Sequence, residues 1–262
     1  MSPLPSLFIS HGAPTFALEP GLAGENLRTL GKKISPLKAV VIVSPHWMTA
    51  SIRVTASPAP ATIHDFQGFD PALYDIQYPA PGDAALATRI VEMLNLAGWP
   101  AAVDAERGLD HGGWVPLLHL LPDADVPVVQ VSLPEDLDGE KAHALGRALS
   151  PLADEGVVVI GSGSLTHNLY EVFKGTEDTE YAEAFSGWIR AAVEAGDHER
   201  LKRALEQAPH ARRAHPTPEH YWPLVVAAGA GQETPATTLK GGMTYQVLCM
   251  DAFVFGRLPV AV

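Results

Sequence analysis

Three histidines of the sequence directly follow short apolar runs that are typical of β-strands. The run LFIS ends at His11, VVIVSP ends at His46, and VVVIGSGSLT ends at His167. A neutral imidazole is the commonest protein ligand of zinc and a frequent ligand of iron, copper and nickel. Three imidazoles that converged at one edge of a sheet would form a metal site with room for water or a substrate.

A fourth histidine, His220, lies far along the chain in the segment HPTPEHYWPL. Thr217 is expected to cap a helix that begins near Pro218, because threonine is a frequent N-cap and proline is favoured at the first helical position. His220 would then lie in the rigid first turn of that helix and close the metal site. Glu219 could coordinate the metal instead, or accept a hydrogen bond from a neighbouring residue.

His111 lies in the segment GLDHGGW, where glycine predicts a loop from which a side chain reaches a pocket. Each histidine also has a simpler interpretation. A single histidine after a strand is usually a hydrogen-bonded polar residue at a sheet edge, and His111 could belong to an ordinary turn. The repeated strand-end position favours the shared metal site. His64 is a weaker candidate, and the following are interpreted as core or surface residues: His119, His143, His198 and His210.

The stretch GSGS at 161–164 follows a predicted strand and raises the question of a phosphate-binding loop. The sequence contains neither GxGxxG nor the lysine of a P-loop there, so nucleotide binding is not favoured. The GxSxG elbow of serine hydrolases is missing as well. Ser162 or Ser164 acting as a nucleophile with His167 stays a minor alternative.

Alternating elements are expected to position these histidines. Short runs of β-branched and aliphatic residues at 7–9, 39–44, 126–133 and 157–162 predict buried parallel strands. Helical spacing predicts helices at 83–98, with Asp83 as N-cap, and at 139–156. This alternation predicts an α/β fold with a doubly wound, mostly parallel sheet and helices on both faces, as a single domain over 1–262. Ligands of such sheets bind beyond the carboxyl ends of the strands, where these three histidines lie.

The second half of the chain predicts the elements around that sheet. Residues 179–208 are expected to form a solvated pair of helices outside the sheet. The stretch 205–218 is rich in proline and charge, and we expect a loop that could be mobile until a ligand orders it. The runs TTLK and YQVLCMDAFVF predict two strands that pair antiparallel at the sheet edge.

Composition excludes several classes of protein. Apolar residues make up 47% of the 262 residues and charged residues 18%, which indicates a globular protein and not a disordered one. A formal charge of −12 argues against binding to nucleic acid or to an anionic membrane. No secretory signal is recognisable, and no apolar run approaches the roughly 20 residues that span a bilayer, so a cytoplasmic location is predicted. The single cysteine, Cys249, is expected to be buried.

Six segments in order carry a resemblance to a known family. They are HGAP at 11–14, SPHW at 44–47, HDFQGFDPALYDIQYPAPG at 64–82, GLDHGGWVPL at 108–117, GSGSLTHNL at 161–169 and HPTPEHYWPL at 215–224. Together they resemble the DOPA-type extradiol aromatic ring-opening dioxygenases, the single-domain, LigB-like branch of the class III extradiol enzymes. The resemblance spans nearly the whole chain. One small departure is HGAP in place of HGSP, which removes a hydroxyl near His11 without an expected change of coordination.

The resemblance implies a metal ion at the strand ends that is held by His11, His46 and His220. It implies that His167 lies beside the metal, as a fourth ligand or as an acid/base group, and that His111 touches the substrate. The related protocatechuate 4,5-dioxygenases complete their site with a glutamate, where this branch uses a histidine. An all-nitrogen site suits Zn²⁺ at least as well as Fe²⁺, so the sequence leaves the ion open between these two.

The implied reaction is the opening of a DOPA-like catechol ring with O₂. We expect His167, assisted by His111, to move the protons. A flat ring prefers an apolar wall, for which the candidates are Phe66, Tyr74, Tyr78, Trp114 and Trp222. The alternatives are a zinc hydrolase and a metal-containing binding protein without turnover. The catechol, the ring bond that breaks and the oligomeric state stay open, although an oligomer is compatible with the sequence.

Overall fold

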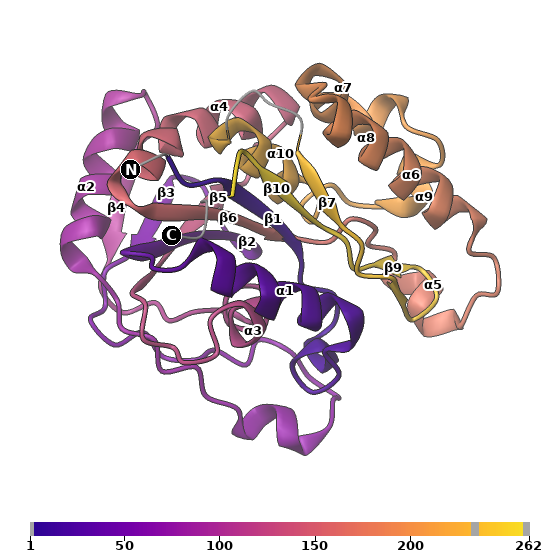
Figure 1. The fold of residues 1–262 in the computed structure, drawn as a ribbon, viewed down its shortest axis with the longest axis horizontal. Helices are drawn as coiled ribbons and strands as arrows, with labels where there is room; N and C mark the ends of the chain where they lie inside the picture. Colours follow the sequence, from indigo (N-terminus) through magenta and orange to yellow (C-terminus); the bar gives the residue numbers. More distant parts are fainter. Residues whose placement is uncertain (1–2, 232–235, 259–262) are drawn as a thin grey trace.

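A computed structural model describes residues 3–231 and 236–258, and a sheet of eight strands forms its central layer (Figure 1). The strand order is β4-β3-β5-β2-β6-β1-β10-β7. The strands are β1 (Ser6–Ser10), β2 (Ala39–Thr49), β3 (Ile52–Thr55), β4 (Ala101–Asp104), β5 (Val128–Pro134), β6 (Val157–Gly163), β7 (Thr237–Leu239) and β10 (Ala252–Phe255). A separate two-stranded sheet consists of β8 (Met243–Thr244) and β9 (Leu248–Cys249).

The centre of the large sheet is parallel. β5, β2, β6 and β1 run in the same direction, and β4 is parallel to β3. The antiparallel pairs lie toward the edges, where β3 meets β5 on one side and β10 pairs with β1 and β7 on the other. The four predicted parallel strands correspond to β1, β2, β5 and β6. The two predicted C-terminal edge strands contribute β7 and β10, which pair antiparallel as expected.

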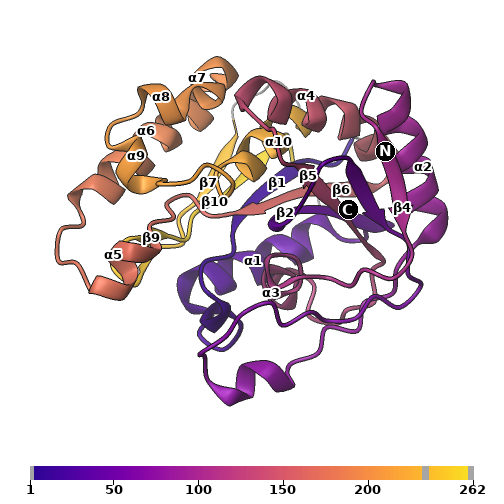
Figure 2. The same cartoon turned by 180° about the vertical axis from the view of Figure 1, so that it is seen from behind.

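Helices cover both faces of the sheet (Figures 1 and 2). Alternate residues of β2 point to opposite sides, so Val40 and Ile42 belong to one apolar core and Val41 and Val43 to the other. The helices are α1 (Gly21–Ile34), α2 (Ala84–Leu96), α3 (His111–Leu120), α4 (Gly139–Leu149), α5 (Leu169–Lys174), α6 (Glu180–Ala195), α7 (His198–Lys202), α8 (Ala204–Gln207), α9 (Ala211–Ala214) and α10 (Trp222–Ala230). Three 3₁₀ helices are η1 (Pro14–Ala17), η2 (Pro71–Asp75) and η3 (Ser150–Glu155). The α/β fold with a mostly parallel sheet is therefore confirmed.

The two predicted helices that follow the sheet pattern are present with small changes at their ends. The Asp83 carboxylate accepts a hydrogen bond from the Leu86 amide at 2.8 Å and caps α2 as predicted. The helix predicted over 139–156 ends at Leu149 and continues as η3. Pro151 lacks the amide hydrogen that an α-helix would need at that point, which accounts for the change of helix type.

The region that was expected to be a solvated helix pair contains three helices, α6, α7 and α8. The inner side of α6 buries Tyr181, Phe185 and Ile189 in the core shared with α2, α4 and α10. This helix also contacts β7 and β9, beside the antiparallel edge of the sheet. The helix α6 is therefore amphipathic, with one side packed in the core and polar residues on the other side.

The stretch 205–218, which was predicted to be a loop, is partly helical and packed. It contains the end of α8 and all of α9. The carbonyl of Ala214 accepts a hydrogen bond from the His167 amide at 2.8 Å, and the carbonyl of Arg213 accepts one from the Asn168 side chain at 2.7 Å. These bonds hold the stretch against the residues that follow β6.

Cys249 is 1% exposed and unpaired, as predicted. Within 3–231 and 236–258, no helix combines the length and the apolar character needed to cross a membrane. The single domain was predicted over 1–262, and its residues 1–2, 232–235 and 259–262 lie outside the described part of the chain. Those bounds stay a prediction.

Candidate metal centre

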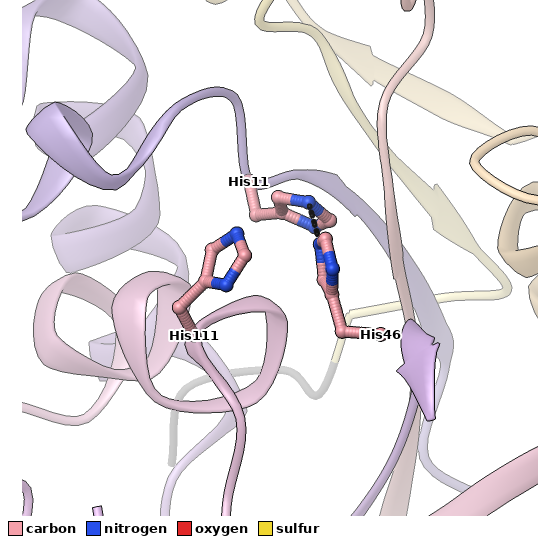
Figure 3. Close-up of side chains that lie close together, drawn as sticks. All are labelled: His11, His46 and His111. Atoms are coloured by element: carbon pink, nitrogen blue, oxygen red, sulfur yellow. Dashed lines mark hydrogen bonds between the residues drawn. The ribbon is translucent and has the colours of Figure 1, made fainter. Parts of the chain in front are cut away.

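Three histidine rings meet near the carboxyl ends of β1 and β2 (Figure 3), and they are named here the strand-end cluster: His11, His46 and His111. His46 was predicted to follow its strand but lies within β2. His11 is the first residue after β1, and His46 lies in β2 where the pairing with β5 shifts between Val43 and Met48. Figure 3 shows the three rings turned toward one another. The ring centroids of His46 and His111 are 4.0 Å apart, and those of His11 and His46 are 5.2 Å apart.

His111 is not in a loop, as was predicted, but is the first residue of α3. Asp110 caps this helix, because its carboxylate accepts a hydrogen bond from the Gly113 amide at 3.1 Å. A glycine at 112 also allows the helix start to approach β2, since a Cβ there would overlap the Ser44 hydroxyl. The first turn of α3 therefore holds His111 in place.

The turn cluster, defined as His167, Glu219 and His220, lies next to the first cluster. The rings of His167 and His220 stack with centroids 3.4 Å apart and an interplanar angle of 9°. The His220 ring is 5.0 Å from that of His46 and 5.5 Å from that of His11, centroid to centroid. Each cluster offers ligand atoms that lie within 4.8 Å of one another, which suits a metal ion. The structure thus brings together all five histidines that the sequence singled out for the site.

The backbone around His220 differs from the prediction. The helix expected near Pro218 begins at Trp222, and His220 lies in the preceding turn, where the Tyr221 amide donates to the Pro218 carbonyl at 2.9 Å. Thr217 caps no helix, and its hydroxyl donates to the Glu219 carboxylate at 2.9 Å. A proline in the first turn does start this helix, but it is Pro223.

Close packing against β6 fixes this turn. The Ser164 amide donates to the His220 carbonyl at 3.0 Å. A Cβ on Gly163 would overlap the His220 carbonyl oxygen, and a Cβ on Gly161 would overlap that of Pro223. The glycines of GSGS therefore allow one backbone to approach another, which is the physical reason for a glycine run without a phosphate-binding fingerprint.

Hydrogen bonds on the Nδ1 side orient the rings of His11 and His220. The Ser162 hydroxyl donates to the Gly112 carbonyl, so its oxygen accepts from His11 Nδ1, which is 2.9 Å away. The Glu219 carboxylate accepts from His220 Nδ1 at 3.0 Å. Both rings then carry their proton on Nδ1 and have a lone pair on Nε2. His11 Nε2 lies within hydrogen-bonding distance of His46 Nε2, at 3.2 Å.

Metal-binding histidines generally have such partners on the nitrogen that does not bind the metal. The donor set of the site therefore fits a divalent ion. Ser162 serves this arrangement and is not paired with His167, while the Ser164 hydroxyl donates to the Thr166 carbonyl at 2.8 Å. These contacts do not support the serine nucleophile considered from the sequence.

Asp65 is a site residue that the sequence interpretation missed. Its Oδ1 accepts hydrogen bonds from His111 Nδ1 at 2.8 Å and from the His111 amide at 2.9 Å. Its Oδ2 lies 3.9 Å from His46 Nδ1. The adjacent His64, which the sequence offered as a weak candidate, has its Nε2 3.0 Å from the Ile76 carbonyl. Only the position of Asp65 inside the segment HDFQGF could have drawn attention to it.

Burial keeps His11, His46, His167 and His220 neutral. It lowers the pKa of His46 to about 3 and that of His167 to about 4. Burial, reinforced by the neighbouring histidines, also places the pKa values of His11 and His220 well below the ordinary 6.5. Neutral imidazoles have the lone pairs that a metal ion requires.

Asp65 differs from these histidines because its lowered pKa favours the charged form. Burial alone would raise its pKa, but the hydrogen bonds from His111 and the interaction with His46 lower the pKa to about 2. The carboxylate is therefore ionised at neutral pH. Asp65 therefore adds a negative charge beside His111 and His46.

The predicted aromatic wall is only partly at the site. Phe66 lies edge-on to His111 with ring centroids 5.7 Å apart, and Tyr74 packs on Phe66 at 5.1 Å. Tyr78 and Trp114 are fully buried and donate hydrogen bonds to the carbonyls of Leu121 and Ile63, at 2.9 Å each. Trp222 belongs to the core on the other face of the sheet. Phe66 thus adjoins His111 directly, and Tyr74 adjoins it only through Phe66.

The histidines interpreted as core or surface residues lie apart from the site. His119 is buried in α3 with its Nε2 2.8 Å from the Phe16 carbonyl. His143 and His198 form a pair between α4 and α7, with 3.0 Å between Nε2 and Nδ1. His210 is exposed. The interpretation of these four histidines as core or surface residues agrees with their placements.

Comparison with known proteins gives a consistent result. Residues 7–256 match the family described as the catalytic LigB subunit of aromatic ring-opening dioxygenase. The chain is 40% identical over 239 residues to the "4,5-DOPA dioxygenase extradiol" of Beta vulgaris, which covers 89% of both chains. It is 39% identical over 245 residues to a protein of the same name from Escherichia coli (strain K12), covering 91% of this chain and 90% of that one.

A solved structure is similar over almost the full length. The crystal structure of an uncharacterized protein from Escherichia coli K12 superposes with a TM-score of 0.80 at 32% sequence identity. The match covers 97% of this chain and 100% of that chain. The order of elements around the histidine site is therefore that of a fold already seen experimentally.

Proposed function

The chain belongs to the LigB family of aromatic ring-opening dioxygenases, and from this membership we propose that it opens a DOPA-like catechol at one Fe²⁺ ion held by His11, His46 and His220. The extradiol dioxygenase activity itself follows from the family and from the relatives that share 39–40% of the sequence. The ion, its ligands, the roles of the other histidines and the identity of the catechol are the parts that are proposed.

The single observation that carries the ligand assignment is that the three rings lie close together while two of them, His11 and His220, are hydrogen-bonded through Nδ1. His11 Nε2 lies within hydrogen-bonding distance of His46 Nε2, at 3.2 Å. The His220 ring lies 5.0 Å from that of His46 and 5.5 Å from that of His11, centroid to centroid, which supports a shared ion. Three neutral nitrogen donors from three separate segments suit one divalent ion.

The reaction favours Fe²⁺ over Zn²⁺ as the working ion. Bound Fe²⁺ would supply redox chemistry toward dioxygen, which Zn²⁺ lacks because it has no accessible second oxidation state. The donor set by itself accepts either ion. We therefore expect a protein that binds both ions but turns over with only one.

His167 and His111 are proposed as the acid/base groups. His167 stacks on His220, and His111 lies beside His46 with 4.0 Å between ring centroids, so both flank the proposed ligands. A histidine in this position can take the proton of a catechol hydroxyl and return a proton as the ring opens. Incorporation of both atoms of O₂ into the open-chain semialdehyde balances the reaction without an external reductant.

Phe66 and Tyr74 are proposed to line the space where the catechol ring lies. Phe66 is close to His111 and only 8% exposed, so its edge can contact a flat apolar ring without leaving the core. The relatives named 4,5-DOPA dioxygenase extradiol support a 4-substituted catechol as the substrate class. The predicted cytoplasmic location and an oligomer stay predictions.

Oxygen uptake tests the proposal. Protein loaded with Fe²⁺ without oxygen and then given O₂ and DOPA should consume one O₂ per catechol and develop visible absorbance. The Zn²⁺-loaded protein and the His46→Ala variant should consume none, and the exposed His210→Asn variant should match the wild type. If iron-loaded protein opens no 4-substituted catechol, the proposed substrate class and ion are wrong. The hydrolase and the binding protein considered from the sequence are not favoured by the family match.

A further inference from the structure

One carboxylate contacts two histidines of the strand-end cluster, and its role goes beyond the ligand set proposed above. We propose that Asp65 is a positioning residue that fixes the His111 ring with an unprotonated Nε2 available to the substrate, and that it thereby makes His111 the proton acceptor. The inference rests on the proposed function, because it assigns a direction of proton transfer within that site.

The hydrogen bonds of Asp65 determine which nitrogen of His111 carries the proton. Oδ1 lies 2.8 Å from the ring Nδ1 of His111 and 2.9 Å from its amide nitrogen. An ionised carboxylate has no proton to donate, so both nitrogens must be donors. A neutral His111 therefore has its hydrogen on Nδ1, and its Nε2 carries the lone pair that can accept a proton.

The same two bonds restrict the orientation of the ring. One oxygen atom holds both the backbone and the side chain of His111, and rotation of the side chain would break the bond to Nδ1. The backbone itself is fixed, because His111 begins α3 and the buried Asp110 caps that helix. The Gln130 side-chain amide donates in turn to Asp110. His111 is thus held from two sides by carboxylates, one of which reaches its ring.

Asp65 is itself well placed for this role. It lies in a segment without regular secondary structure, but its two neighbours are anchored. His64 contacts the Ile76 carbonyl at 3.0 Å, and the Phe66 ring packs between His111 and Trp114, with centroids 5.7 Å and 6.3 Å away. The carboxylate therefore has a defined position without belonging to a helix or strand.

His167 lacks a comparable partner. The described residues provide no hydrogen bond to its ring, which contacts the face of the His220 ring. The two proposed acid/base histidines are therefore different. When His111 takes the proton of a catechol hydroxyl, the O–H bond breaks, an Nε2–H bond forms, and the Nδ1–H stays hydrogen-bonded to Asp65. The negative carboxylate stabilises the imidazolium that results, and return of the proton reverses the step.

Asp65 also lies near His46. Its Oδ2 is 3.9 Å from His46 Nδ1, which is too long for a direct hydrogen bond. The main effect of Asp65 should therefore pass through His111 and only weakly through the proposed ligand. This difference separates a role in proton transfer from a role in metal binding.

The experiment compares Asp65→Asn with Asp75→Asn in the iron-loaded enzyme. Asp75 is exposed in the same part of the chain, so its variant loses the same charge without touching the site. We expect Asp65→Asn to lower kcat roughly 100-fold with a change in KM below about threefold, because the loss should fall on the proton-transfer step. Iron content should equal that of wild type, and Asp75→Asn should behave as wild type.

Double variants test whether Asp65 acts through His111. In a His111→Ala background, Asp65→Asn should lower kcat by less than about a further twofold, because the group that Asp65 positions is already gone. In a His167→Ala background, Asp65→Asn should lower kcat by the full factor. An equal loss in both backgrounds, or a loss of iron that accounts for the lost rate, would overturn the inference.

A readout without turnover completes the test. In Zn²⁺-loaded protein, ¹⁵N NMR of labelled histidine should show the Nδ1–H tautomer for His111 in the wild type and a mixture of tautomers in Asp65→Ala. An Nε2–H tautomer in the wild type would contradict the inference even if the enzyme is active. If the wild type opens no catechol, the proposed function fails first, and the NMR result still reports on Asp65.

Discussion

The strand-end cluster and the turn cluster contain similar side chains but are held in place by different means. In the strand-end cluster, the ring nitrogens of His11 and His111 are bound by side chains from distant segments, Ser162 and Asp65. In the turn cluster, His220 is bound by its sequence neighbour Glu219, and its position depends on a backbone that packs on β6. The first cluster therefore depends on side-chain hydrogen bonds, and the second on close backbone packing.

The largest expected effect tests whether the two clusters hold one ion or two. His11→Ala and His220→Ala should each weaken Fe²⁺ or Zn²⁺ binding by at least roughly 100-fold, because loss of a ligand should exceed the 10- to 100-fold loss seen when a ligand loses its hydrogen-bond partner. Competition with a chelator measures the affinity, and His210→Asn is the control. A His220→Ala variant that still binds one ion with wild-type affinity would show that the turn cluster does not share the ion.

Backbone packing under the turn cluster is tested at Gly161. A Cβ at this position would overlap the Pro223 carbonyl oxygen, so Gly161→Ala should destabilise the protein by about 3 kcal/mol. Gly187→Ala is the matched control, because a Cβ there meets nothing within 4 Å and alanine favours the helix. Chemical denaturation of both variants gives the free energies of unfolding. Equal stabilities would mean that His220 does not need this close approach.

Side-chain anchoring is tested by Ser162→Ala and Glu219→Gln. Ser162→Ala leaves the His11 Nδ1–H buried without an acceptor, and metal affinity should fall roughly 10- to 100-fold. Glu219 is partly exposed, so a glutamine or a water molecule can replace its hydrogen bond to His220. Glu219→Gln should therefore lower metal affinity less than about tenfold. Isothermal titration with Zn²⁺ measures both affinities. The reverse order would mean that the turn cluster is the one held by side-chain hydrogen bonds.

The smallest effect concerns His215, at the start of the segment that leads to the turn cluster. Burial lowers its pKa to about 4, and its Nε2 donates to the Leu165 carbonyl at 3.0 Å. The unfolded chain binds a proton below about pH 6.5 that the folded chain does not, so stability falls as the pH drops toward 4. Between pH 6.5 and pH 5, the free energy of unfolding of His215→Gln should fall by about 1 to 2 kcal/mol less than that of the wild type.

Denaturation of the metal-free proteins at several pH values measures this difference in slope. The other buried histidines contribute to the acid sensitivity of both proteins, so the comparison isolates His215. Identical slopes for the variant and the wild type would show that His215 is protonated in the folded state or that it titrates alike in both states.

The sequence predicted the place of a side chain well where that residue lies at or near the end of a strand with a clear apolar pattern. His11 and His46 come at or near the ends of buried apolar strands, and parallel strands bring their carboxyl ends to the same edge. The glycine run at 161–164 was visible, but its function was not, because overlap with His220 and Pro223 depends on a contact between segments some sixty residues apart. The start of α10 was misplaced because two prolines, at 218 and 223, can each begin a helix.

The sequence by itself determined the α/β fold and the family, and it singled out the five histidines proposed for the site, since each rests on local periodicity or on an ordered set of motifs. Only the tertiary structure decided which histidine contacts which, that Ser162 and Glu219 orient two of the rings, and that Asp65 joins the site. Hydrogen bonds between residues as far apart as 46 and 151 positions leave no periodic pattern in a chain. They exist only when the folded backbone brings their donors and acceptors within bonding distance.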